Sequence, residues 1–329
     1  SGLDKVIIAL AGDWGADTKD SNRINLAMKN ANPDYTIHIG DTYFVGSKDE
    51  IRDTYLEKDS WYRGTSGSFV LLGNHDMYSH GKYYFKDLLP TLGIKELGHY
   101  RGQKTSYFCL ENEYWRILGL DTGYNDATKL ANQGDCHFED ELINWLKDIV
   151  KLGNPDDKRG LIFLTHHQYR NANATEYHKP AEQLAEIIGE ERKTLWIWGH
   201  EHFFAIFKGY KSLKGITAYG RCIGHGGMPI QLPLKDFRRK DNVLVYDARK
   251  YDEDEDIEYG YNGFALMYIK ENQIEIEYKD IMNNTLVSEK WSIDINTGDI
   301  NCDSFNANDI LKSTGYVLSE DAMKIYNDK

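Results

Sequence analysis

Residues 36–46 of the sequence read TIHIGDTYFVG. The run 36–39 is largely apolar, which is typical of a strand buried on both faces. The strand ends at Gly40-Asp41, so a carboxylate directly follows a buried segment. In α/β sheets, ligands bind in the crevice at the carboxyl ends of the strands. We therefore expect Asp41 to lie at the edge of a buried sheet, where it can bind a ligand.

Short apolar runs of the same kind recur along the chain and alternate with helical patterns. We expect strands at 6–11, 36–39, 69–72, 115–120, 161–164 and 195–198, and helices at 20–30, 138–152 and 180–189. Strands that alternate with helices indicate a layered α/β domain. Further along, 264–280 predicts a β-hairpin, whereas the acidic stretch 247–262 predicts a solvated loop.

The composition narrows the classes of function. A formal net charge of −13 argues against a nucleic-acid-binding protein, because phosphate backbones attract Lys and Arg. It does not exclude a phosphate-ester substrate, since bound cations can reverse the local field. No apolar run approaches the ~20 residues that a membrane helix requires. The four cysteines could form two disulfides or none, and two N-glycosylation sequons, at Asn173 and Asn283, favour a lumenal location.

Five strand ends carry side chains that can bind metal ions. They read Gly12-Asp13, Gly40-Asp41, Gly73-Asn74-His75, Thr165-His166-His167 and Gly199-His200-Glu201-His202. A single strand-end Asp, Asn or His is more often a turn residue, a helix cap or a structural histidine. The pair His200 and His202 is a stronger signal, because residues two apart in an extended segment point to the same side. All five in this order, each after an apolar run, point instead to one shared site. Mixed oxygen and imidazole donors suit zinc, iron or manganese.

The order GD, GD, GNHD, HH, GHEH resembles the calcineurin-like metallophosphoesterases. GDWG at 12–15 is similar to the purple acid phosphatase branch of that family, and the resemblance extends over about residues 5–292. It implies an α/β fold of the αββα type, in which helices flank a sandwich of two β-sheets. It also implies two divalent or trivalent metal ions, such as zinc, iron or manganese. We expect one metallophosphoesterase domain over 1–292 and a C-terminal extension over 293–329.

The resemblance also implies roles for individual residues. Asp13 and His202 would bind the first metal, Asp41 would bridge the two, and Asn74, His166 and His200 would bind the second. His75 matches a family histidine that contacts the substrate and can protonate the leaving group. His178 is the nearest candidate for a second such histidine, although Thr175 stands closer to the expected position.

The residues after Asp41 depart from the purple acid phosphatase pattern. That branch places a metal-binding tyrosine three residues after the bridging aspartate, and here this position is Phe44, which offers no oxygen. Tyr43 stands one residue early, and in an extended chain a shift of one residue turns the ring to the opposite face. We therefore expect the phenolate ligand to be lost, unless a shortened loop brings Tyr43 back to the metal.

The chain as a whole also resembles the glideosome-associated membrane anchors of apicomplexan parasites, through GDTYF at 40–44, THHQY at 165–169 and RCIGHGGMPIQLP at 221–233. This resemblance implies a scaffold or receptor for an actomyosin gliding-motor complex at the inner membrane complex, with motor-complex proteins as partners. It implies a lumenal domain, anchored in the membrane through a segment beyond residue 329, with weak or absent phosphatase activity. The alternative is an active dimetal acid phosphatase that hydrolyses phosphomonoesters with a metal-bridging hydroxide.

Overall fold

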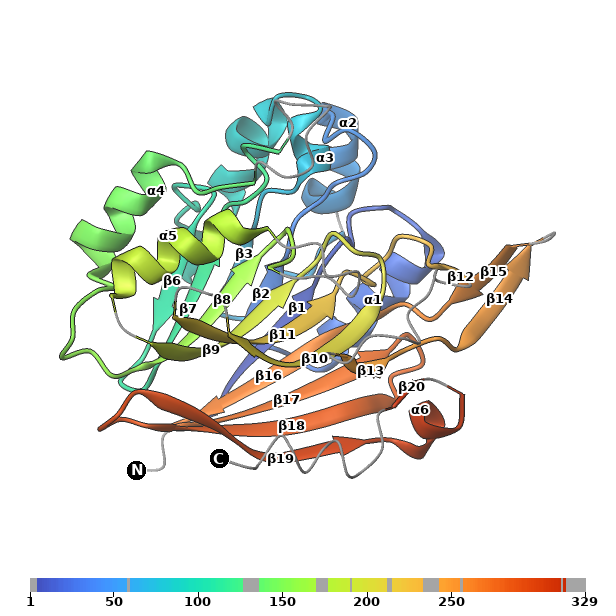
Figure 1. Cartoon of the computed structure of the whole chain (residues 1–329). Helices are drawn as coiled ribbons and strands as arrows, with labels where there is room; N and C mark the ends of the chain where they lie inside the picture. The colour runs from blue at the N-terminus through green and yellow to red at the C-terminus, as the bar shows by residue number, and fades with distance from the viewer. Residues whose placement is uncertain are drawn as a thin grey trace.

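The computed structural model consists of two large β-sheets that pack face to face, with helices on their outer faces (Figure 1). It describes residues 5–57, 60–126, 136–169, 177–189, 191–211, 215–232, 243–254, 257–314 and 316–317. The sandwich of two sheets flanked by helices, expected from the family resemblance, is confirmed.

The spatial order of the strands differs from their order along the chain. From one edge to the other, the first sheet comprises β19 (Asp299–Ala307), β18 (Thr285–Asp294), β17 (Gln273–Asp280), β16 (Gly263–Lys270), β1 (Val6–Ala11), β2 (Tyr35–His38), β3 (Gly67–Val70), β4 (Gly93–Glu96) and β5 (His99–Tyr100). The second comprises β20 (Tyr316–Val317), β13 (Val243–Tyr246), β10 (Phe204–Lys211), β11 (Ile216–Ile223), β9 (Arg192–Trp198), β8 (Gly160–Thr165), β7 (Trp115–Leu120) and β6 (Phe108–Glu111). A small third sheet contains β12 (Gln231–Leu232), β15 (Ile257–Gly260) and β14 (Lys250–Asp254).

Helices and helical turns cover both outer faces of the sandwich. Over the first sheet lie α1 (Lys19–Asn30), α2 (Lys48–Ile51), η1 (Arg52–Leu56), α3 (Asn74–Met77), η2 (Tyr84–Leu88) and η3 (Leu89–Thr91). Over the second lie α4 (Asp140–Trp145), η4 (Leu146–Val150) and α5 (His178–Ile188), while α6 (Asp309–Thr314) follows β19. The three helices predicted from sequence correspond to α1, to α4 with η4, and to α5.

Side chains alternate between two cores along the central strands. In β1, Ile8 and Leu10 point into the core between the sheets, whereas Ala9 and Ala11 face the helices over the first sheet. Burial on both faces explains the continuous apolar runs in the sequence. All six strands predicted from such runs are confirmed, and β1 and β7 have the predicted bounds.

The strands that precede the candidate site run parallel within each sheet. β1, β2 and β3 are parallel neighbours in the first sheet. β7, β8, β9 and β11 are parallel neighbours in the second. Because parallel strands end at the same edge, each sheet gathers the residues that follow its strands along one edge, where ligands bind in α/β folds.

One expectation about the later part of the chain needs correction. The acidic stretch 247–262 is not a loop throughout, because β14 and β15 pair within it as antiparallel strands. Further along, β18 runs across residue 292 and pairs with β19, while the division into a domain and an extension stays a prediction. Trp291, Ile293 and Ile300 are buried on this pair of strands, which gives the segment an apolar face to pack on the core.

The four cysteines all lie within the described residues and form no disulfide.

A buried ion pair joins the two sheets. Arg221 in β11 and Glu289 in β18 are both fully buried, and the Nε and Nη2 atoms of the guanidinium donate to the carboxylate at 2.9 and 2.7 Å. The guanidinium also donates to the backbone oxygens of Phe207 at 3.1 Å and Gly220 at 2.7 Å. The Tyr278 hydroxyl donates to Glu289 at 2.6 Å. Both ends of the pair are therefore hydrogen-bonded, as a buried ion pair requires.

Candidate metal centre

Three strand ends of the first sheet supply side chains to the candidate site. Asp13 follows β1, Asp41 follows β2, and Asn74 opens α3 after β3. All three side chains are buried. Asp13 and Asp41 have left-handed backbone conformations, with φ of 56° and 73°. Such conformations are uncommon outside glycine and concentrate at functional sites.

The second sheet supplies three imidazoles. His166 follows β8, and His200 and His202 follow β9. His166 is fully buried, while His200 and His202 are half-buried. The backbone N–H of His200 donates to Asp13 Oδ2 at 2.6 Å. This hydrogen bond joins the edge of the second sheet to the edge of the first, so the two edges form one site.

Four side chains form what we term the first donor group, namely Asp13, Asp41, Tyr43 and His202. The Tyr43 hydroxyl lies 2.7 Å from Asp13 Oδ1, 3.0 Å from Asp41 Oδ2 and 2.8 Å from His202 Nε2. His202 Nε2 lies 3.5 Å from Asp13 Oδ1. Donor atoms that each bind one cation at about 2.0–2.2 Å lie roughly 3 to 3.5 Å from one another. The group therefore has the spacing of a cation site.

Four side chains form the second donor group, namely Asp41, Asn74, His166 and His200. Asn74 Oδ1 lies 3.1 Å from both His166 Nε2 and His200 Nδ1. Asp41 Oδ2 lies 3.3 Å from His166 Nε2. The structure thus brings together all six residues predicted as metal ligands, and Asp41 belongs to both groups.

Glycine at the strand ends allows the donor residues to approach one another. A Cβ atom on Gly73 would lie 2.0 Å from Asp41 Oδ1. A Cβ atom on Gly40, whose φ is +90°, would lie 2.5 Å from His166 Nδ1. Both positions therefore need a residue without a side chain, since any other would displace a donor residue.

Gly73→Ala should displace the Asp41 carboxylate and weaken metal binding. A ligand that binds only the native state stabilises it by RT ln(1 + [L]/Kd), so a tenfold weaker Kd lowers metal-induced stabilisation by about 1.4 kcal/mol. The measurement is the rise in thermal midpoint on adding zinc or manganese after chelation. Gly260→Ala, whose added methyl meets Ile230 at 3.1 Å, is the control and should keep the rise. An undiminished rise in Gly73→Ala would argue against Asp41 as a ligand.

A family model described as Calcineurin-like phosphoesterase matches residues 7–204, which is more than half of the chain and includes every residue of both donor groups. The chain belongs to the calcineurin-like phosphoesterase family.

Two solved structures share the fold of this phosphoesterase at low sequence identity. GAP50, described as the anchor in the inner membrane complex of Plasmodium, aligns with a TM-score of 0.57 and 14% identity over 89% of this chain and 90% of its own. PhoD aligns with a TM-score of 0.58 and 11% identity over 99% of this chain and 76% of its own. No curated protein sequence matches the chain. At these identities the likeness establishes the fold and not the activity.

Calcineurin-like phosphoesterases generally bind a dimetal centre, and the donor atoms of this chain fit one. Carboxylate, phenol, amide and imidazole groups together suit zinc, iron or manganese. Burial opposes the ionisation of Asp41, but the adjacent His166 outweighs it and holds the pKa of Asp41 well below its usual value. Burial acts to lower the pKa of His166, but the contact with Asp41 outweighs burial and raises this pKa. A proton on His166 thus balances the buried carboxylate, a role that a bound cation can take over.

The charge of Tyr43 depends on whether a cation occupies the first donor group. Burial and the charges of Asp13 and Asp41 raise the pKa of Tyr43 well above its usual value. A phenol between two carboxylates keeps its proton unless a positive charge lies beside it. A cation held by this group would supply that charge, and Tyr43 could then bind it as a phenolate.

The structure agrees with the alternative in which the loop brings Tyr43, and not Phe44, to the donor residues. The Phe44 side chain is 66% exposed, whereas that of Tyr43 is 5% exposed and contacts three donor residues. The left-handed turn at Asp41 interrupts the extended backbone, so the alternation of faces that would have turned Tyr43 away does not apply. The Tyr43 N–H donates to Gly15 O at 2.8 Å, which ties the loop to the segment after β1.

The Glu50 carboxylate holds the next part of this loop. It accepts the backbone N–H groups of Phe44 at 2.5 Å, Val45 at 3.2 Å and Ser47 at 2.7 Å. Ser47 and Glu50 form the capping box that begins α2. The S-K-D-E motif at 47–50 is a signal that sequence reasoning could have used to place a helix start, and hence a fixed loop, directly after Phe44.

The two histidines predicted to contact substrate have different surroundings. The backbone N–H of His75 donates to Asp41 Oδ1 at 2.9 Å, and its ring centroid lies 4.6 Å from that of Tyr43. His178 opens α5 and is exposed, and Thr175 lies outside the described residues. The structure therefore places His75 at the donor groups, while the role of His178 stays a prediction.

His167 and Asp126 form a contact that the sequence did not indicate. His167 Nε2 lies 3.2 Å from Asp126 Oδ2, and its ring centroid lies 4.5 Å from that of His200. His167 is fully buried behind His166. The pair packs against the second donor group and supports the orientation of the His200 ring. In the sequence, the adjacent residues His166 and His167 were the only signal for this contact.

Proposed function

We propose that this chain is a dimetal phosphoesterase that hydrolyses phosphomonoesters. The observation that carries the proposal is the position of Asp41 Oδ2, 3.0 Å from the Tyr43 hydroxyl and 3.3 Å from His166 Nε2. Two cations, when bound, polarise a phosphoryl group and activate water for attack on it. The sequence had favoured a scaffold with weak or absent turnover, because the tyrosine ligand was expected to be lost and the second substrate histidine was unclear. With the Tyr43 hydroxyl beside the donor residues, the first of these reasons no longer holds.

Hydrogen bonds around the donor residues orient them for metal binding. The His75 N–H donates a hydrogen bond to Asp41 Oδ1, so that Oδ2 faces both donor groups. The Asn74 Nδ2 amide donates to the Tyr78 hydroxyl at 3.3 Å, so that Oδ1 faces the imidazoles. Partners of this kind fix ligand orientation and are part of a metal site.

His75 is our candidate for the proton donor to the leaving group. Its Nδ1 lies 2.6 Å from the backbone oxygen of Phe44, which can only accept, so Nδ1 carries a hydrogen. To act as the acid, the ring would carry a second proton on Nε2 and pass it to the leaving oxygen.

The proposal is tested by the hydrolysis of p-nitrophenyl phosphate after chelation and resupply of zinc, manganese or iron. We expect turnover that depends on the added metal and falls at least about 100-fold in Asn74→Ala, since even outer-shell changes at metal sites cost 10–100-fold. Asn22→Ala, an exposed position on α1, is the matched control and should retain wild-type turnover. If none of the three metals gives turnover above that of Asn74→Ala, the proposal is rejected.

A scaffold role with weak or absent turnover is the second candidate. It is supported by the likeness to GAP50, described as an anchor, over 89% of this chain. That likeness would imply an inner membrane complex location and, with the sequence resemblance, motor-complex partners. No helix in the described ranges is long and apolar enough to cross a bilayer. Of the two N-glycosylation sequons, the one at Asn283 is exposed between β17 and β18, and the one at Asn173 lies outside the described residues. Metal-dependent stabilisation without turnover would favour this role.

A further inference from the structure

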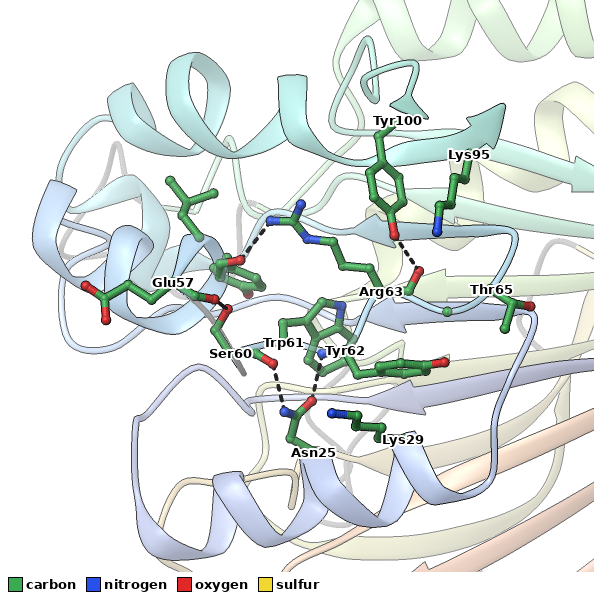
Figure 2. Close-up of a pocket in the computed structure, with 13 residues that line it drawn as sticks. Asn25, Lys29, Glu57, Ser60, Trp61, Tyr62, Arg63, Thr65, Lys95 and Tyr100 are labelled. Carbon is green, nitrogen blue, oxygen red and sulfur yellow. Dashed lines mark hydrogen bonds between the residues drawn. The ribbon is translucent and has the colours of Figure 1, made fainter. Parts of the chain in front are cut away.

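A pocket of about 530 Å³ lies between α1, the end of η1, the segment 60–65 and strands β4 and β5 (Figure 2). Its lining includes no residue of either donor group. The volume falls within the range of about 300–1,000 Å³ that is usual for small-molecule sites. The pocket is therefore a candidate binding site separate from the metal centre.

The pocket carries a local excess of positive charge. Lys29, Arg63 and Lys95 line it. Arg63 is half-buried, and its guanidinium donates to the backbone oxygens of Thr91 at 3.2 Å and Tyr55 at 2.8 Å. Among the described residues, no carboxylate forms an ion pair with Arg63 or Lys95. In a chain whose net charge is −13, a cluster that includes two such cations indicates a site for an anion.

The acidic residue in the lining does not cancel this charge. Glu57 is exposed, and its Oε1 lies 3.5 Å from Arg52 Nε. Arg52 does not line the pocket. Arg52 also contacts Asp49 at 2.6 Å and Asp53 at 2.7 Å, so it does not neutralise Glu57 alone. In Figure 2 the Glu57 carboxylate points away from Arg63 and Lys95, and the pocket lining holds three cations against this one carboxylate.

Aromatic rings stand beside the cations. The Tyr100 ring centroid lies 5.5 Å from Arg63 Cζ and 5.8 Å from Lys95 Nζ, and the Tyr100 hydroxyl donates to Arg63 O at 3.2 Å. Figure 2 shows Lys95 and Tyr100 on one side of Tyr62 and Lys29 on the other. Tyr62 is half-buried, so part of its ring is open to a ligand. Flat rings stack on such side chains, in offset or edge-to-face arrangements.

We propose that this pocket binds an organic phosphate of the size of a mononucleotide. The phosphate group is held by Arg63 and Lys95, with Lys29 on the opposite side, because ionised donors make the strongest hydrogen bonds to phosphate oxygens. The planar part of the ligand lies against Tyr62 or Tyr100. The proposal does not depend on the phosphoesterase function, since no residue of the donor groups takes part.

The test is calorimetric titration of AMP into chelator-treated Asp41→Asn protein. This substitution removes the carboxylate shared by the donor groups, so the metal centre neither binds nor hydrolyses the probe. We expect one AMP per chain, with Kd about tenfold weaker in Lys95→Gln, as for the loss of one charge-assisted hydrogen bond. Lys86→Gln makes the same change of charge at an exposed position on η2 outside the pocket and should leave Kd unchanged.

Two further titrations measure the contributions of the planar base and of the phosphate group separately. Adenosine and inorganic phosphate should each bind more weakly than AMP, because each supplies only one of the two kinds of contact. The proposal is overturned if Lys95→Gln binds AMP as tightly as its parent, or if Lys86→Gln weakens binding equally. It is also overturned if inorganic phosphate binds as tightly as AMP, because the rings would then contribute nothing.

Discussion

Protein loaded with ferric iron should be purple, and Tyr43→Phe should remove the colour completely. The Tyr43 hydroxyl lies between 2.7 and 3.0 Å from Asp13, Asp41 and His202, so a ferric ion in the first donor group has a phenolate within reach. By the family resemblance, a tyrosine phenolate bound to iron is the source of the purple colour. The measurement is the visible absorption spectrum of iron-loaded wild type and variant. Turnover should fall at least about tenfold, since a direct ligand is lost.

Phe44 supplies the matched controls for this prediction. Phe44→Leu changes an exposed ring and should keep the absorption band. The double change Tyr43→Phe with Phe44→Tyr keeps both rings but moves the hydroxyl to the exposed position, and it should stay colourless. A coloured double variant would show that residue 44 reaches the metal, contrary to the contacts of Tyr43 and the exposure of Phe44.

Arg221→Leu should lower the free energy of unfolding by about 3–5 kcal/mol, because it leaves the Glu289 carboxylate buried without its cation. Both side chains are fully buried between the sheets, so solvent cannot compensate for the loss. The measurement is urea unfolding, read as the change in midpoint at constant slope.

The matched variant removes both charges together. Arg221→Leu with Glu289→Leu leaves no buried ion, and replacements of this kind are often neutral or stabilising. Tyr278→Phe should be added to it, since the Tyr278 hydroxyl otherwise loses its acceptor. We expect the triple variant to be more stable than Arg221→Leu alone. If the single change costs less than about 1 kcal/mol, the ion pair does not hold the sheets together.

The positions of the six expected metal ligands could be predicted because the sequence carries their pattern directly. Each ligand follows a buried strand, and burial on both faces leaves a continuous apolar run before it. What the runs alone could not show is that the edges of two different sheets meet. That depends on contacts between distant residues, such as Asp13 and His200, which are 187 residues apart. This part came from the family resemblance.

The position of Tyr43 could not be predicted, because the rule applied to it assumes an extended chain. At Asp41 φ is 73°, and the next residue, Thr42, forms an isolated bridge with Gly15 instead of continuing β2. A left-handed residue in a loop redirects every side chain after it, and no pattern of apolar residues reports it.

The strand β19 could not be predicted from the sequence either. Its sequence, DINCDSFNA, has mixed polarity because β19 is an edge strand with one exposed face.

The donor groups join the two layers of the fold as well as forming a site. Asp13, Asp41, Tyr43 and Asn74 belong to the edge of the first sheet, and the three histidines to the edge of the second. Each group contains donors from both edges, so neither edge can open locally without releasing a bound cation. Metal binding then raises the free energy of opening for both edges by the same amount. Strand ends that could open separately thereby become one cooperative unit, whose local unfolding depends on metal concentration.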